Sequence, residues 1–104
     1  MAGFRVSAIA GQRLDEIYVY TRDTWGDAQA QAYIRGLFSR FDSIARHDQP
    51  WRAIPGDFGV DGFYCRHEHH YVYWRLLGDD MVGIVTILHE RMHLMDRFRE
   101  DSGA

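Results

Sequence analysis

The sequence predicts an α+β domain in which an antiparallel helical hairpin packs on one face of a small antiparallel β-sheet. Two amphipathic helical patterns fill the first half of the chain and are separated only by Gly26 and Asp27. Segments rich in β-branched and aromatic residues fill the second half. A chain of 104 residues has room for one hydrophobic core, so we expect residues 1–104 to form a single domain.

The first half begins with a short strand and continues as two helices. Residues 4–6 alternate apolar and polar side chains, and Ser7 is a suitable N-cap for the first helix. Gly26 can adopt the left-handed conformation that ends a helix, and Asp27 can cap the next one, which must stop before Pro50. Because this connection is so short, the helices must run antiparallel. The predicted apolar faces contain Leu14, Ile17, Tyr18, Thr21 and Trp25, and then Ala30, Tyr33, Leu37, Phe41 and Ile44.

The second half is predicted to form three antiparallel strands after an irregular crossing at residues 48–61, which contains both prolines. The first turn is expected at His67-Glu68 and the second at Gly78-Asp79-Asp80. After the last strand, a short helix containing Leu94, Met95 and Phe98 could close the chain. The strands are expected at 63–66, 71–77 and 81–88.

The last strand is the organising segment of the sheet, because it is apolar on both faces. Regular alternation places Val82, Ile84, Thr86 and Leu88 on one face and Gly83, Val85 and Ile87 on the other. We therefore expect a central strand that stops at His89.

Composition limits the classes of function. All 12 basic residues are arginines and the formal net charge is −3. Bulk attraction of the whole chain to nucleic acid is therefore not expected, although a local patch of arginines could still exist. The single cysteine, Cys65, excludes an internal disulfide and fits a reducing compartment. No segment is long and apolar enough to cross a membrane, so a cytoplasmic protein is expected. We also expect no cofactor.

Two ordered sets of residues stand out along the chain. The first consists of L-D-E-I at 14–17, Y-T at 20–21, W-G at 25–26, Q-A at 29–30 and Tyr33. The second consists of H-Y-V-Y at 70–73 and I-L-H-E-R-M at 87–92. In this order they resemble the hairpin and sheet signatures of the ParE branch of the RelE/ParE toxins of type II toxin-antitoxin systems. The chain departs from the pattern at Thr86, where many members have arginine, and at His93, where aspartate is usual.

The resemblance implies a toxin that binds DNA gyrase without catalysis and that a ParD-like antitoxin neutralises. Because antitoxins of this family wrap around the hairpin and sheet, the resemblance implies antitoxin contacts for the hairpin aromatics Tyr18, Tyr20 and Trp25, whose plain alternative is core packing. The segment after the last strand is the most exposed apolar and basic segment expected. We therefore predict that Arg91, Met92 and Phe98 contact the target.

Two enzymatic alternatives remain open from the sequence. Tyr73, Arg75, His89 and Arg91, joined by Arg66, could converge on one sheet face as in the ribosome-dependent mRNA endonucleases of the RelE type. His89 and His93 could instead bind zinc as an H-E-x-x-H peptidase motif, with Glu90 as the base and Asp96 or Glu100 as a further ligand. That motif requires a helix, whereas the preceding residues predict a strand.

A second possible metal site lies earlier in the chain. Cys65, His67 and His69 alternate and would share one side of a continuous strand, with His70 adjacent. A turn at His67-Glu68 would destroy that alignment. The sequence therefore favours a polar hairpin end with a half-buried cysteine over a metal site.

Overall fold

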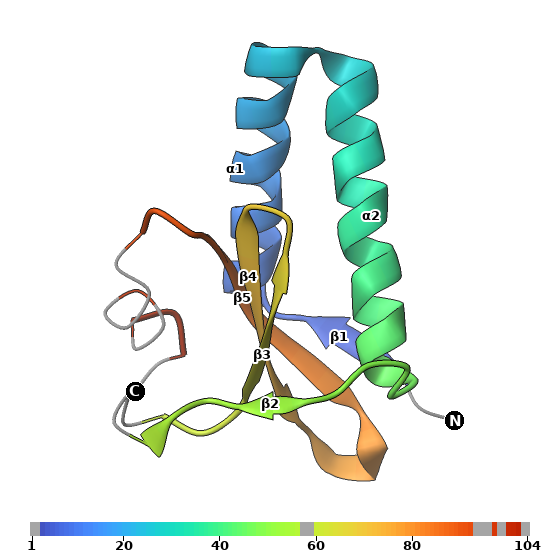
Figure 1. Ribbon diagram of the computed structural model, residues 1–104, viewed down its shortest axis with the longest axis vertical. Coiled ribbons are helices and arrows are strands. Elements are labelled where there is room, and N and C mark those ends of the chain that lie inside the picture. The colour runs from blue at the N-terminus through green and yellow to red at the C-terminus, as the bar shows by residue number, and fades with distance from the viewer. Residues whose placement is uncertain (1–2, 57–59, 93–96, 98–99, 103–104) are drawn as a thin grey trace.

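The computed structural model describes residues 3–56, 60–92, 97 and 100–102. A hairpin of two helices stands on a twisted sheet, as Figure 1 shows. The elements in chain order are β1 (Phe4–Val6), α1 (Ala8–Trp25), α2 (Asp27–Ala45), β2 (Arg52–Ala53), β3 (Phe63–His67), β4 (His70–Leu76), the 3₁₀ turn η2 (Gly78–Asp80) and β5 (Val82–His89). The predicted α+β class and helical hairpin are confirmed.

The helix boundaries follow from capping. Ser7 has an extended backbone, and its hydroxyl accepts a hydrogen bond from the Ala10 amide at 3.0 Å, which starts α1. Gly26 ends α1 with a φ of 100°, and its amide donates to the Arg22 carbonyl at 2.8 Å. The second helix starts at the next residue, so the hairpin has almost no loop.

The sheet is larger than predicted and is mixed. Its order is β1-β5-β4-β3-β2, with β1 parallel to β5 and every other neighbouring pair antiparallel. The segment predicted to be an irregular crossing contributes the short edge strand β2. The three-stranded meander is therefore correct, but it forms the centre of a five-stranded sheet.

The first hairpin turn lies one residue later than predicted. His67 pairs with His70, so the two turn residues are Glu68 and His69. Glu68 takes a left-handed φ of 52°, which lets a two-residue turn join two strands. The second turn falls at the predicted residues, where Asp79 and Asp80 also have positive φ.

The strands bury side chains on both faces of the sheet. On the helix-covered face, Phe41 and Leu37 pack with Trp74 and Ile84 in the main core. On the opposite face, a smaller cluster contains Ile54, Val60, Tyr73 and Leu88.

The predicted faces of β5 are wrong beyond Ile84. A bulge interrupts the pairing of β4 with β5, since Tyr73 lies opposite Thr86 but Trp74 lies opposite Ile84. The unpaired residue is Val85, whose carbonyl accepts a hydrogen bond from the Ser7 hydroxyl at 2.8 Å. Consequently Ile87 joins Ile84 on the helix side, while Thr86 and Leu88 face the other way.

The far half of the hairpin extends past the end of the sheet (Figure 1). Leu14 and Ile17 in α1 are buried, but Trp25 is 71% exposed although it continues the same helical face. Trp25 is therefore not packed in the core, which was the plain alternative to an antitoxin contact. Among the residues that the structure describes, no helix is long and apolar enough to cross a membrane.

Candidate functional site

A groove of about 320 Å³ lies between α1 and the end of β5. The helix contributes Arg13 and Tyr20, and the sheet contributes His70 and His89. The residues after β5 close it. Helix, sheet and the segment after β5 therefore meet here. The side chains that this segment contributes are Arg91 and Met92.

His70 connects the floor of this groove to the second helix. Its Nδ1 atom lies 2.5 Å from the Tyr33 hydroxyl, and burial, followed by the nearby His89, lowers the pKa of His70 to about 4. A neutral imidazole can accept at Nδ1, so the Tyr33 hydroxyl donates this bond. The Tyr33 phenol is itself hard to ionise, because burial raises its pKa to about 12.

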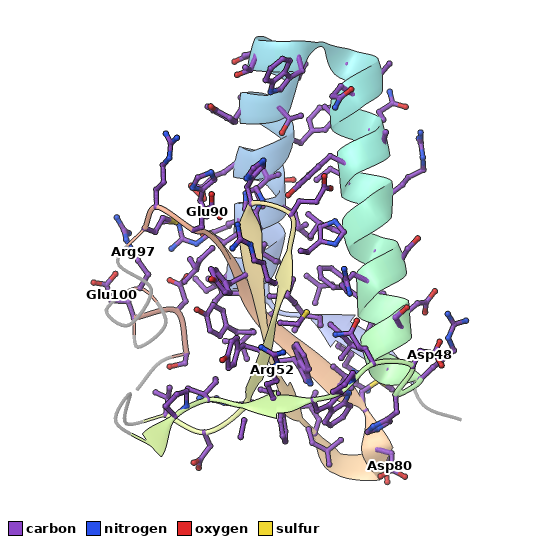
Figure 2. All side chains as sticks on the ribbon, in the orientation of Figure 1. Asp48, Arg52, Asp80, Glu90, Arg97 and Glu100 are labelled. Carbon is purple, nitrogen blue, oxygen red and sulfur yellow. The ribbon has the colours of Figure 1, made fainter. Side chains whose placement is uncertain are left out.

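Charged and polar groups also surround His69 and His89 at this end of the sheet. Glu90 forms ion pairs with Arg66 and with His69, whose Nδ1 lies 3.4 Å from the carboxylate. The Arg91 amide donates to Nδ1 of His89 at 3.0 Å. Figure 2 shows Glu90 at the end of the sheet nearest the hairpin. The carboxylate is therefore part of a structural network at this end.

The geometry does not support the zinc-peptidase alternative. His89 is the last residue of a strand, and His93 lies outside the described residues, as does Asp96. Glu90 is held in ion pairs with Arg66 and His69. Within the described parts of the chain, no three histidine, cysteine or acidic side chains are grouped so as to hold a metal ion, including those around Cys65.

The residues of the nuclease alternative lie on two faces of the sheet. Tyr73 belongs to the cluster on the uncovered face and is 2% exposed, and burial raises its pKa to about 12. Arg75 shares that face by strand alternation, and its guanidinium donates to the Asp61 carbonyl at 3.3 Å. His89 lies on the helix side beside His70, with ring centroids 5.2 Å apart. The expected convergence of these residues is therefore wrong, because the bulge at Val85 turns His89 away from Tyr73.

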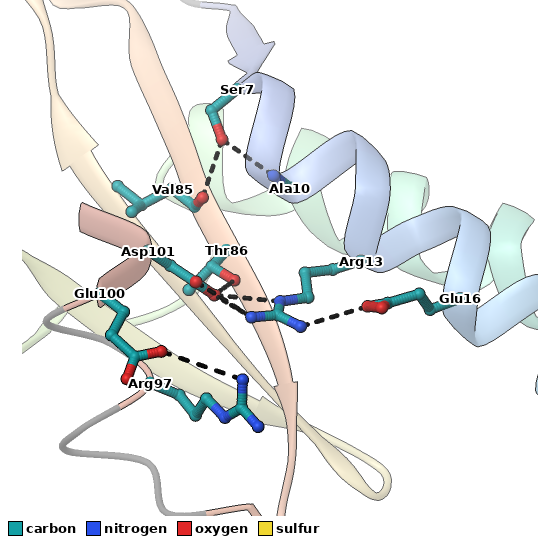
Figure 3. A network of polar contacts seen from close by, with 9 residues as sticks. All are labelled: Ser7, Ala10, Arg13, Glu16, Val85, Thr86, Arg97, Glu100 and Asp101. Carbon is teal, nitrogen blue, oxygen red and sulfur yellow. Dashed lines mark hydrogen bonds and ion pairs between the residues drawn. The ribbon is translucent and has the colours of Figure 1, made fainter. Parts of the chain in front are cut away.

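A polar network that the sequence did not predict lies beside the groove (Figure 3). The Arg13 guanidinium donates two-pronged hydrogen bonds to the Asp101 carboxylate, with distances of 2.8 to 3.0 Å. The Thr86 hydroxyl donates to the same carboxylate at 2.8 Å. Thr86 therefore holds the C-terminal segment in place, and the cation beside it comes from α1. A separation of 88 residues between Arg13 and Asp101 leaves no local signal for this contact.

The three hairpin aromatics differ in their surroundings. Tyr18 is half-buried and its hydroxyl donates to Asp27 across the hairpin. Tyr20 and Trp25 are exposed by 67% and 71%. Two of the three residues predicted to contact an antitoxin are therefore free of the core.

The residues predicted to contact a target also differ. Arg91 is exposed immediately after the end of β5. Met92 is half-buried and packs against the cluster on the uncovered face of the sheet. Phe98 lies outside the described residues. Arg91 is thus the member of this set that the described surface presents most openly.

Comparison with known proteins identifies the family. The family model for the ParE toxin of the type II toxin-antitoxin system parDE matches residues 4–94. "Toxin ParE" of Escherichia coli is 34% identical over 100 residues, which cover 96% of each chain. "Toxin ParE1" of Caulobacter vibrioides is 32% identical over 94 residues, which cover 89% of this chain and 94% of the relative.

The fold has a solved counterpart. A chain of the "Chromosomal ParDE TA system from P. aeruginosa" superposes with a TM-score of 0.69 at 17% identity, covering 86% of this chain and 96% of that one. At this identity the likeness concerns the fold. Together with the match over residues 4–94 and the relatives at 30% identity or more, it leads to one conclusion: this chain belongs to the ParE toxin family of type II toxin-antitoxin systems.

Proposed function

We propose that this chain inhibits DNA gyrase by binding it, and that a ParD-like antitoxin neutralises it by covering the hairpin. The observation that carries the proposal is the family match across residues 4–94, nearly the whole chain. The structure similar to this chain comes from the chromosomal ParDE TA system of P. aeruginosa.

The exposed aromatic side chains of α1 support an antitoxin-binding role. Tyr20 and Trp25 are large aromatic side chains left in solvent, and Val19 beside them is also exposed. Aromatic residues dominate the energetics of many protein interfaces, because each buries a large area at little entropic cost. An antitoxin segment that orders on these side chains would remove them from water.

The sheet end supports binding without catalysis. A nuclease must surround a phosphate with preorganised cations, an acid and a base. Tyr73 and Arg75 lie on the opposite face from His89, and Tyr73 is buried. A gyrase-binding toxin needs only a complementary surface, for which Arg91 and Met92 at the groove are suitable.

The target is tested by adding purified chain to two assays in parallel. Gyrase with relaxed plasmid should lose supercoiling activity and accumulate cleaved DNA, while translating ribosomes should leave their mRNA intact. The variant Arg91→Ala should weaken gyrase inhibition, and Arg46→Ala, an exposed arginine at the end of α2, should not. Cleavage of mRNA with normal supercoiling would contradict the proposal.

The partner is tested by co-purification with the product of the neighbouring gene. Trp25→Ala and Tyr20→Ala should each weaken capture of that product by about tenfold or more. The matched control is Leu76→Ala, which removes an exposed apolar side chain at the β4–β5 end of the molecule. Equal losses in all three variants would show that the aromatics are not the contact site.

A further inference from the structure

A second cavity, of about 430 Å³, lies at the free edge of β3, below the last part of α2. The helix contributes Arg40, and β2 contributes Arg52. The sheet contributes Arg66 and Cys65 from β3, with the half-buried rings of Tyr64 and Tyr71. This arginine pocket shares no lining residue with the groove beside α1.

The pocket exists because β2 is too short to cover β3. β2 pairs only with Phe63 and Tyr64, and the Ile54 amide then donates to the Gly62 carbonyl at 2.9 Å. Alternate residues of a strand direct their amide and carbonyl groups to the same edge. The backbone groups of Arg66, like those of Gly62 and Tyr64, therefore point to the β2 side of β3. The Arg66 amide therefore points to an edge where β2 has already ended.

The pocket is strongly basic in a chain of net charge −3. Among the residues that the structure describes, its lining contains three guanidinium groups and no carboxylate. Glu90 forms an ion pair with Arg66 and so offsets part of its charge. The groove beside α1, by contrast, has Glu16 in its own lining.

The three arginines are held differently. Arg40 is half-buried, and it donates from Nη1 to Gln49 at 2.9 Å and from Nε to His67 Nδ1 at 3.3 Å. These two bonds fix its guanidinium without neutralising it. Arg66 is anchored by the Glu68 carbonyl at 2.8 Å. Arg52 is exposed on β2, as Figure 2 shows. The pocket thus combines two positioned cations with one that lies exposed on a short edge strand.

We propose that the arginine pocket binds the phosphodiester backbone of a single nucleic-acid strand, with Arg40 and Arg52 on the phosphate and the Arg66 amide as a further donor. Guanidinium groups match phosphate oxygens with two parallel hydrogen bonds, and an amide on a strand edge beyond the end of β2 suits the same acceptor. Tyr64 and Tyr71 add aromatic surface beside the cations, with ring centroids 6.4 Å apart.

The tyrosines favour a nucleic-acid strand over an acidic peptide. Single-stranded nucleic acids bind where a basic groove lies beside aromatic side chains on which bases stack. An acidic peptide would use the cations but has no planar groups to place on those rings. Binding of this kind is independent of which enzyme the toxin inhibits, so it can be measured on the purified chain alone.

The direct test is fluorescence anisotropy with a labelled oligothymidine strand at low salt. Arg52→Gln should weaken binding roughly tenfold, because a charge-assisted contact is lost. It should also reduce the slope of log affinity against log salt by about 0.7, the value for one phosphate contact on a single strand. The matched control is Arg35→Gln, an exposed arginine on α2 that does not line the pocket. Equal effects of the two variants would overturn the proposal.

Cys65 supplies a second measurement on the unmodified chain. It is the single cysteine of the chain and lines the pocket, so its alkylation rate reports on occupancy of this place alone. Burial raises the pKa of the Cys65 thiol, so the reaction should be run at mildly alkaline pH. Saturating oligothymidine should slow alkylation at least about fivefold, and polyglutamate of equal charge should protect less. Stronger protection by polyglutamate, or no protection by oligothymidine, would exclude a nucleic-acid site.

Discussion

The two halves of the helical hairpin have similar sequence patterns and opposite surroundings. Near its base, Leu37 and Phe41 of α2 are fully buried against the sheet. At its tip, Trp25 continues the apolar face of α1 but meets no strand and lies in solvent. Helical periodicity therefore identifies a face that will be covered, but it does not say by what. In this chain, the uncovered half is the half that we propose as a partner surface.

The largest expected effect is at the base of the hairpin. Phe41→Ala removes a fully buried ring that contacts Phe4 and Phe38, and it should lower the free energy of unfolding by about 3–5 kcal/mol. Phe38→Ala, three residues earlier and partly exposed, should cost about 1 kcal/mol. Urea denaturation of both variants measures the difference, and similar losses would mean that burial does not distinguish the two positions.

An intermediate effect is expected between base and tip, at the contact of Arg13 with Asp101. Asp101→Asn keeps the shape of the side chain but leaves the Arg13 guanidinium without its carboxylate, at a cost of about 1–3 kcal/mol. Glu100→Gln is the control, because its ion pair with Arg97 is exposed and long, at 3.9 Å. The measurement is the midpoint of urea denaturation, and an unchanged midpoint in Asp101→Asn would show that the C-terminal contact adds no stability.

A smaller, pH-dependent effect is expected at His70, where the helices leave the sheet. The pKa of His70 is about 4 in the folded chain and near 6.5 when unfolded, so the unfolded state binds the proton first. This contribution is fully present above pH 6.5 and is lost as the pH falls from 6.5 through 4. Because the side chain is partly solvated, the loss should be about 1–2 kcal/mol.

The pH prediction is checked with two histidine variants. His70→Gln should remove part of the loss between pH 6.5 and 4, since glutamine has no proton to gain. His69→Gln should leave it intact, because His69 is 71% exposed. If the free energy of unfolding of both variants declined with pH as it does in the parent chain, the acid sensitivity would belong to other groups. His67 is one such group, because burial also lowers its pKa.

The smallest effect on stability is expected at the tip. Trp25→Ala should change the free energy of unfolding by no more than about 0.5 kcal/mol, because the indole is mostly in solvent. The same substitution should weaken antitoxin capture severely. Thermal melting should therefore show almost unchanged stability, while co-purification should show a large loss of binding. A strong loss of stability would falsify the assignment of Trp25 to a partner surface.

Local signals predicted most of the fold. The cap at Ser7, the helix end at Gly26 and the turn at residues 78–80 all depend on neighbouring residues, and the structure has each at its predicted place. The parallel pairing of β1 with β5 was not predictable in the same way, because Phe4 and Val82 are 78 residues apart. Edge strand β2 has two residues and therefore shows no alternation to detect.

The candidate site was less predictable, since it depends on long-range geometry. The sequence showed which histidines, arginines and aromatics could act, but it could not show that Arg13 bonds Asp101 or that Tyr73 and His89 lie on opposite faces. The three arginines of the pocket at β3 come from three elements. Only the folded chain brings such residues together, and no spacing rule describes them.

The bulge at Val85 divides β5 into two segments in which the alternation of side chains between the two faces is opposite. Before it, even-numbered residues face the helices, as Val82 and Ile84 do; after it, odd-numbered residues do, as Ile87 does. One extra residue therefore reassigns every side chain downstream, including His89. A strand of the same length that kept the pairing of its first half but formed no bulge would place Val85 opposite Tyr73, and it would carry its histidine on the face of Tyr73 and Arg75. The presence or absence of a bulge in this strand is then enough to scatter, or to gather, residues with the chemistry of a nuclease.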